Sequence, residues 1–97
     1  MSMWPPDAVE ARPWNGDGPR PAYRFYPPLG PLLSIRVGGR WRPAVVRGRE
    51  DREDGTVVYH VEITLTLHDG VRGTVDRAYV WDPAAMHPAP PVRGFGP

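Results

Sequence analysis

The sequence predicts an all-β domain built from antiparallel strands. In residues 57–68 an apolar side chain stands at every odd position, and from His60 onward a polar one stands at every even position. A two-residue repeat over this length indicates a β-strand with one buried and one solvated face, as is typical of antiparallel sheets. Shorter alternating runs lie on both sides of it, separated by Gly-Gly and Asp-Gly turn signals.

Proline marks the boundaries of the foldable part. Of the 14 prolines, only Pro43 lies between residues 32 and 82. We therefore divide the chain into a Pro-rich N-terminal arm at 1–31, a β domain at 32–82 and a Pro-rich C-terminal tail at 83–97. A domain of about 50 residues buries only about 60% of the surface that its unfolded chain exposes, which argues against a self-contained catalytic cleft.

The arm is predicted to be irregular over residues 1–22, which show no periodicity. It contains two tryptophans, so part of it is expected to fold back and cover an apolar edge. Residues 23–26 can form a short strand, and the prolines of 27–31 then impose an extended connection.

The first strand of the domain is expected at 33–37, where apolar and polar residues alternate before the hairpin signal Gly38-Gly39. The second strand is expected at 41–47, with Pro43 at an edge or a bulge because proline cannot donate a ladder hydrogen bond. The charged run at 48–55 is expected to be a solvated loop.

The long strand at 57–68 follows, and Asp69-Gly70 turns the chain into a strand at 71–75 and a short last strand at 78–81. A straight strand of 12 residues would span about 40 Å, which is too long for so small a body, so we expect it to coil and to serve two sheets. Five strands of this kind predict a small SH3-like barrel.

Three segments carry a resemblance to a known class of domain. They are Gly-Arg-Trp-Arg-Pro-Ala-Val-Val at 39–46, Asp-Gly-Thr-Val-Val-Tyr-His-Val at 54–61, and the Asp-Gly turn at 69–70. In these segments the chain resembles Tudor and agenet-type domains. The resemblance implies the barrel fold and an aromatic cage for a cationic side chain. By position, the cage walls would be Trp41, Tyr59, Tyr79 and Trp81, with Asp76 or Asp82 as the acid; the alternative is that these rings only fill the core.

The first functional hypothesis is a non-catalytic interaction module. Tryptophan and tyrosine beside arginine are the residue types that anchor protein interfaces, and so small a barrel offers a surface rather than a deep pocket. The predicted partner is a peptide or another protein. The residues expected to bind it are Tyr26, Trp41, Tyr79 and Trp81.

The alternative hypothesis is a nucleic-acid-binding barrel that uses the basic first hairpin. The arginines concerned are Arg36, Arg40, Arg42, Arg47 and Arg49. The predicted domain is neutral overall, however, which argues against a surface that binds phosphate backbones. These arginines have a second interpretation, in which they pair with the adjacent acidic loop or with the acidic segment 50–54 of a second copy.

Catalysis and metal binding find little support in the residues present. The chain has no cysteine, and neither a nucleophile elbow nor a Gly-rich phosphate loop occurs. His60, Glu62 and His68 share the wet face of the long strand and are interpreted as solvated residues rather than metal ligands. No enzymatic activity, metal or cofactor is therefore expected.

The tail and the composition complete the expectations. Residues 88–93 match the Pro-x-x-Pro-x-Arg pattern that SH3 grooves recognise, which indicates either a spacer or self-association through the tail. No apolar run is long enough to cross a bilayer and no signal peptide is evident, so a cytoplasmic protein without membrane contact is expected. All 12 basic residues are arginine, which is typical of a GC-rich genome such as that of an actinobacterium or its phage.

Overall fold

The computed structural model describes residues 5–28, 30–67 and 70–89. Within them it contains six strands and no helix, and hence no helix that could cross a membrane. The strands are β1 (Ala22–Phe25), β2 (Leu32–Val37), β3 (Arg40–Asp51), β4 (Val57–Thr66), β5 (Arg72–Val80) and β6 (Met86–Pro88). Every strand pair is antiparallel, so the predicted all-β antiparallel class is confirmed.

From Tyr59 to Leu65 the odd-numbered side chains of β4 face the core, as the two-residue period predicts, while Val58 on the other face is also 0% exposed. Val61 and Ile63 are 2% and 0% exposed, and they belong to the central cluster of buried residues. Tyr59 and Leu65 are partly buried and pack against that cluster, and Leu67 just beyond the strand is also partly buried. The apolar stripe of the sequence is therefore the buried stripe of the strand.

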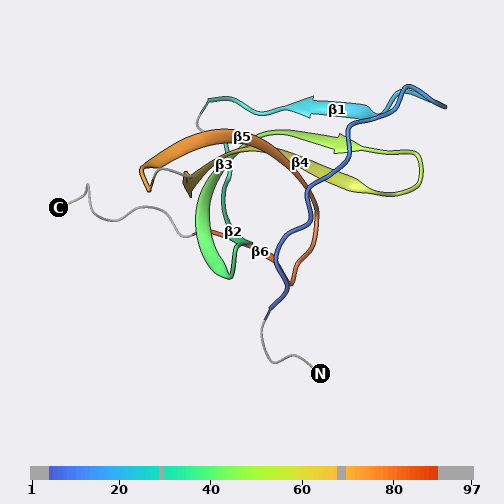
Figure 1. Cartoon of the computed structure of the whole chain (residues 1–97). Helices are drawn as coiled ribbons and strands as arrows, with labels where there is room; N and C mark the ends of the chain where they lie inside the picture. Colours follow the sequence, from blue (N-terminus) through green and yellow to red (C-terminus); the bar gives the residue numbers. More distant parts are fainter. Residues whose placement is uncertain (1–4, 29, 68–69, 90–97) are drawn as a thin grey trace.

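β3 is the strand that two parts of the sheet share (Figure 1). Along one edge, residues 40–45 pair with β2 and residues 48–51 pair with β1. Along the other edge β3 pairs with β4, and the register shifts between Val46 and Gly48. Arg47 is thus the extra residue of a β-bulge, a feature that bends a strand and increases its twist.

Two expectations are corrected by this strand. The segment 48–51 is not part of a loop, because its backbone pairs with β1 and β4 at once. The strand that serves two partners on one edge is β3, whereas β4 pairs with β3 and β5 along its length. The bend lies at Arg47 because the bulge there removes one residue from the regular ladder.

The prediction of a closed barrel with five strands is not confirmed. The strands form an open path, β5-β4-β3-β2-β6, to which β1 is added through β3. The N-terminal arm crosses the opening between the two ends of this path (Figure 1). The N–H of Ala8 donates to β2 at 2.8 Å, and residues 9–11 share hydrogen bonds with residues 78 and 80 of β5. The arm therefore covers the outer edge of β5.

β5 is one continuous strand, not two short ones separated at Asp76-Arg77. Both residues keep the regular register, opposite Glu62 and Val61 of β4. The guanidinium of Arg77 lies 3.2 Å from the carboxylate of Glu10 in the arm. Both residues are exposed, so the strand accommodates their charges without burying them.

The core extends beyond residue 82 into the Pro-rich tail. β6 pairs with β2, and Ala85 and Met86 are 0% and 1% exposed. Met86 is among the largest fully buried side chains of the described part. The Pro-x-x-Pro-x-Arg match at 88–93 continues into residues 90–97, which lie outside the described residues.

Met86→Ala tests whether the start of the tail belongs to the folded unit. We expect it to lower the free energy of unfolding by about 2–5 kcal/mol, because it removes most of a buried side chain from a packed core. Urea denaturation measures this loss. The control is Thr66→Ala at the exposed end of β4, expected within about 0.5 kcal/mol of wild type. Equal effects of the two changes would contradict the assignment of β6 to the core.

Candidate interaction site

The four aromatic residues predicted to form a docking groove do not share one environment. Tyr79 is 3% exposed and belongs to the core cluster, and Tyr26 is partly buried against it. Trp41 and Trp81 are each 38% exposed. Burial removes Tyr79 from any docking surface, because a partner cannot reach its ring, and it raises the pKa of the Tyr79 phenol.

The two tryptophans belong to separate ring pairs. Trp41, near the start of β3, has its ring centroid 4.6 Å from that of His87 in β6, and the guanidinium of Arg36 lies 6.0 Å from the Trp41 ring. Trp81, just after β5, meets Tyr59 edge to face at 5.6 Å. The four rings that the Tudor-type resemblance implies as cage walls therefore do not come together. Trp41 pairs with His87, Trp81 pairs with Tyr59, and Tyr79 lies in the core.

Of the two candidate acids of the cage, Asp82 is engaged in a turn and Asp76 lies opposite another acid. Asp82 accepts a hydrogen bond from the backbone N–H of Ala84 at 2.9 Å, which forms the turn that leads into β6. Asp76 is exposed and lies opposite Glu62 in the ladder between β4 and β5. Asp82 thus has a local structural role.

Three of the five arginines of the alternative site are ion-paired. Arg36 lies 3.6 Å from Asp7, Arg47 3.0 Å from Glu62, and Arg49 2.9 Å from Asp51. Only the pair with Asp51 involves the acidic segment 50–54 that the sequence offered as a partner. These pairs neutralise much of the basic character that a phosphate backbone would need.

The remaining two arginines differ from each other in burial. Arg40 is exposed at the start of β3, whereas Arg42 is partly buried opposite the core residue Ile35. Within the described residues, the buried Nε atom of Arg42 has no hydrogen-bond partner. The five arginines therefore do not form one accessible patch.

A second aromatic surface lies on β1. Phe25 is 81% exposed, Tyr23 is 40% exposed, and their ring centroids are 4.4 Å apart. Residues two apart in a strand point to the same face, so β1 presents both rings on one side. This face also carries Gly48 and Glu50 of β3, which lie opposite Phe25 and Tyr23 in the register.

The Tyr23 ring lies against the backbone of Gly48. A Cβ atom added to Gly48 would overlap the hydroxyl oxygen and neighbouring ring atoms of Tyr23. The Tyr23 ring also meets His60 of β4, with centroids 5.1 Å apart. Tyr23 is thus held between two strands while part of its ring remains accessible.

A buried carboxylate joins the strands beneath Tyr23. Glu50 is 7% exposed and is the buried charged residue of the described part. It accepts a hydrogen bond from Arg52 at 2.5 Å and lies 2.9 Å from Nε2 of His60. Arg52 also donates to the backbone oxygen of Arg12 at 2.6 Å, which ties the arm to the end of β3.

The charges of this cluster set the protonation of its members. Burial raises the pKa of Glu50, but hydrogen bonds from Arg52 and His60 and their charges outweigh it, so the pKa lies below its ordinary value. Burial, and next the negative charge of Glu50, raise the pKa of the Tyr23 phenol. Glu50 is therefore ionised, and Tyr23 neutral, near pH 7.

Two of the three side chains weighed as metal ligands have other partners. His60 is bound to Glu50, and Glu62 to Arg47. His68 lies outside the described residues. Among the residues that the structure describes, no group of three or more metal-binding side chains comes together.

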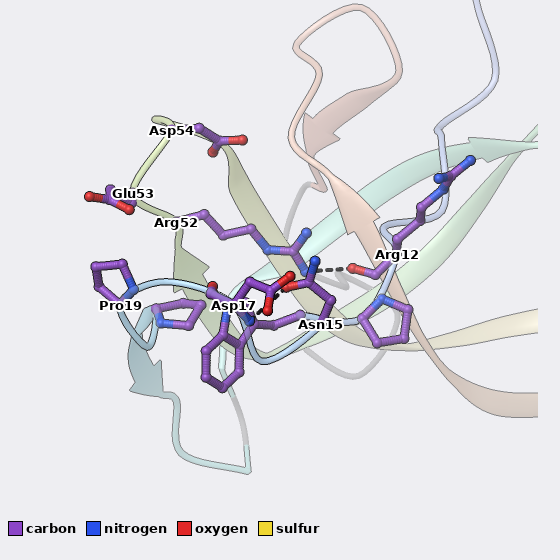
Figure 2. A pocket seen from close by; sticks show the side chains of 10 residues that line it. Arg12, Asn15, Asp17, Pro19, Arg52, Glu53 and Asp54 are labelled. Atoms are coloured by element: carbon purple, nitrogen blue, oxygen red, sulfur yellow. Dashed lines mark hydrogen bonds between the residues drawn. The ribbon is translucent and has the colours of Figure 1, made fainter.

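A cavity of about 450 Å³ lies between the arm and the turn after β3 (Figure 2). Trp14 lies in its wall and donates from Nε1 to the backbone oxygen of Asp17 at 3.0 Å. Arg52 reaches across to the arm at Arg12, as the dashed line in Figure 2 marks. The charged lining residues are Arg12, Asp17, Arg52, Glu53 and Asp54. The cavity is thus a polar seam where the arm meets the sheet.

Comparisons with protein-family models, curated proteins and solved structures find no match to this chain. The candidate site therefore rests on its geometry. The sequence predicts a strand at 23–26 but does not single out Tyr23 or Phe25 as binding residues. The signal that could have found them is a pair of aromatic side chains two residues apart, on one face of a predicted strand.

Gly48→Ala tests the contact between Tyr23 and the β3 backbone. We expect it to lower the free energy of unfolding by about 1–3 kcal/mol, because the added methyl group displaces the ring. In a Tyr23→Ala background the same change should instead be neutral or stabilising by about 0.5–1 kcal/mol, since alanine restricts the unfolded chain more than glycine does. A double-mutant cycle by urea denaturation measures the coupling. Additive effects would contradict the proposed contact.

Acid titration tests the Glu50 cluster. Because the folded state holds the pKa of Glu50 below its ordinary value of 4.5, the unfolded state binds more protons as the pH falls. The contribution of Glu50 to stability is therefore fully present above about pH 4.5 and is lost as the pH falls through the folded pKa. Unfolding free energies measured between pH 7 and pH 3 should fall less steeply in Glu50→Gln than in wild type. Thr66→Ala, which removes no titratable group, should keep the wild-type profile.

Proposed function

We propose that this chain is a non-catalytic interaction module that docks a peptide or protein surface on Tyr23 and Phe25. The observation that carries the proposal is the exposure of Phe25, 81%, beside a tyrosine whose ring is already fixed by β3 and β4. An exposed phenylalanine in contact with a second ring is a feature of interaction surfaces. A pre-positioned ring loses little conformational freedom on binding, which favours affinity.

We place the docking surface on β1 rather than on the tryptophans. Trp41 and Trp81 are each 38% exposed, against 81% for Phe25, and they belong to separate ring pairs, whereas Tyr23 and Phe25 lie together on one face of β1. We further propose that the domain is a variant of the small SH3-like barrel. The support is the strongly bent β3, shared by two partner strands, and the arm that crosses the open side of the sheet.

Nucleic-acid binding through the first hairpin is less well supported. The ion pairs of Arg36, Arg47 and Arg49 would have to be broken or shared before those side chains could neutralise phosphates. The proposed lack of catalytic activity has its own support. The Glu50 carboxylate, the buried acid of the described part, is already bound by Arg52 and His60.

Selection of binders from a displayed library of random peptides tests the proposed function. We expect binders whose affinity falls roughly tenfold or more in Phe25→Ser, the loss typical of truncating an interface anchor. The fold should be unaffected, because the Phe25 side chain is exposed. The matched control is Val71→Ser, which removes an apolar side chain that is 59% exposed before β5. A library that yields no binder, or binders equally sensitive to both changes, would contradict the proposal.

A further inference from the structure

We infer that the outer edge of β1 receives an extended segment of a partner protein by antiparallel strand addition, with an acidic residue of the partner opposite Arg24. This inference rests on the proposed function and specifies the partner's conformation and charge. It is carried by three observations: the direction of the β1 backbone groups, the excess positive charge at Arg24, and the apolar face beside it.

The backbone of β1 has one side available for pairing. β1 pairs only with β3 among the described strands, and Figure 1 shows no other described element along its outer side. The N–H of Tyr26 donates to Arg47 of β3 at 3.0 Å. Because hydrogen-bonding direction alternates along a strand, residues 22 and 24 also direct their backbone groups at β3. Those of Tyr23 and Phe25 therefore point to the outer edge.

Arg24 carries a charge that the fold balances only in part. It lies directly opposite Arg49 in the register, and two like charges in that position repel each other. Within the described residues Arg24 has no ion pair, while the nearby Asp51 is bound to Arg49. The two arginines thus share one carboxylate. An acidic side chain on an incoming strand, opposite Arg24, would supply the missing negative charge.

The face of β1 that carries Tyr23 and Phe25 suits apolar side chains of a partner. A strand paired with β1 would place the residues on either side of its acid next to Tyr23 and Phe25. A hollow of about 300 Å³ beside Tyr23 is lined partly by Trp14 and Pro21. The segment recognised is therefore extended, with an acid flanked on both sides by apolar, preferably β-branched, residues.

A second copy of this chain fits the edge less well. The self-pairing register that uses all outward-facing groups places Tyr23 opposite Phe25 of the other copy, and this puts the two Arg24 side chains opposite each other. Like charges at the centre of so short a pairing oppose it, and an edge arginine is a common device against self-association. The charge that favours an acidic partner thus disfavours a dimer.

The test uses the isotope-labelled full chain and short capped peptides in which threonine and valine flank a central glutamate, in the order Thr-Val-Glu-Val-Thr. We expect this peptide to shift the amide resonances of Tyr23 and Phe25 on titration. A peptide with arginine at the centre should bind at least about twofold more weakly, since an opposite-charge pair is replaced by a like-charge pair. In Arg24→Glu the order of the two affinities should reverse.

Backbone methylation supplies the matched control for strand pairing. N-methylation of the two valines should abolish the shifts, because these amides face β1, whereas N-methylation of the glutamate should leave them unchanged. Shifts that are insensitive to valine methylation, the same affinity for both central residues, or no shift at Tyr23 and Phe25 would each overturn the inference. A wild-type dimer in sedimentation experiments with Tyr23 and Phe25 amides protected from exchange would overturn it in favour of self-pairing.

These outcomes are separable from failure of the proposed function. Some library peptides could lose affinity in Phe25→Ser yet still bind after every backbone amide of the peptide has been methylated. Such peptides would support docking on the two rings and contradict strand addition. Failure of the library to yield any binder would remove the proposed function, and loss of the peptide shifts would then remove the inference as well.

Discussion

The fold depends on one constraint, the requirement that β3 pair with two different strands along the same edge. β2 occupies its first half and β1 its last four residues, while β4 follows the whole bend on the other side. The bulge at Arg47 makes this possible because it changes the twist at the boundary between the two partners. It also fixes where the connection from β1 to β2 crosses, since Gly30 lies against the backbone oxygen of Val46 with no room for a side chain. The positions of Tyr23 and Phe25, on their shared face of β1, therefore depend on this bend.

Much of the fold could be predicted, because the two-residue period of β4 is a local property of the sequence. Local periodicity does not predict that β3 continues beyond Arg47. The residues that continue β3, among them Glu50 and Asp51, have low strand propensity, and they form a strand because Arg52 and His60 satisfy the buried carboxylate. The sequence does not predict β6 for a similar reason. Three residues next to proline are too short to show a period, and the burial of Met86 comes from its pairing with β2.

The candidate site was less predictable than the fold because its contacts are distant in sequence. Trp41 and Trp81 attract attention as tryptophans, yet each pairs with a ring from another strand. The basic hairpin suggests an anion site, yet Asp7 and Glu62, from other segments, neutralise two of its arginines. Tyr23 is positioned by a glycine that only the register between β1 and β3 brings beneath it. None of these pairings can be read from local spacing, since each depends on which strands become neighbours.

The arm at residues 8–11 has a further consequence for the newly made chain. Residues 9–11 are translated well before residues 78 and 80 of β5, with which they share hydrogen bonds. Until then the segment has to stay soluble and avoid wrong pairings. Its surroundings suit that delay, because prolines at 5, 6 and 13 lack the N–H groups that a misplaced strand would need. The proline content of the arm thus serves nascent-chain behaviour as well as the finished fold.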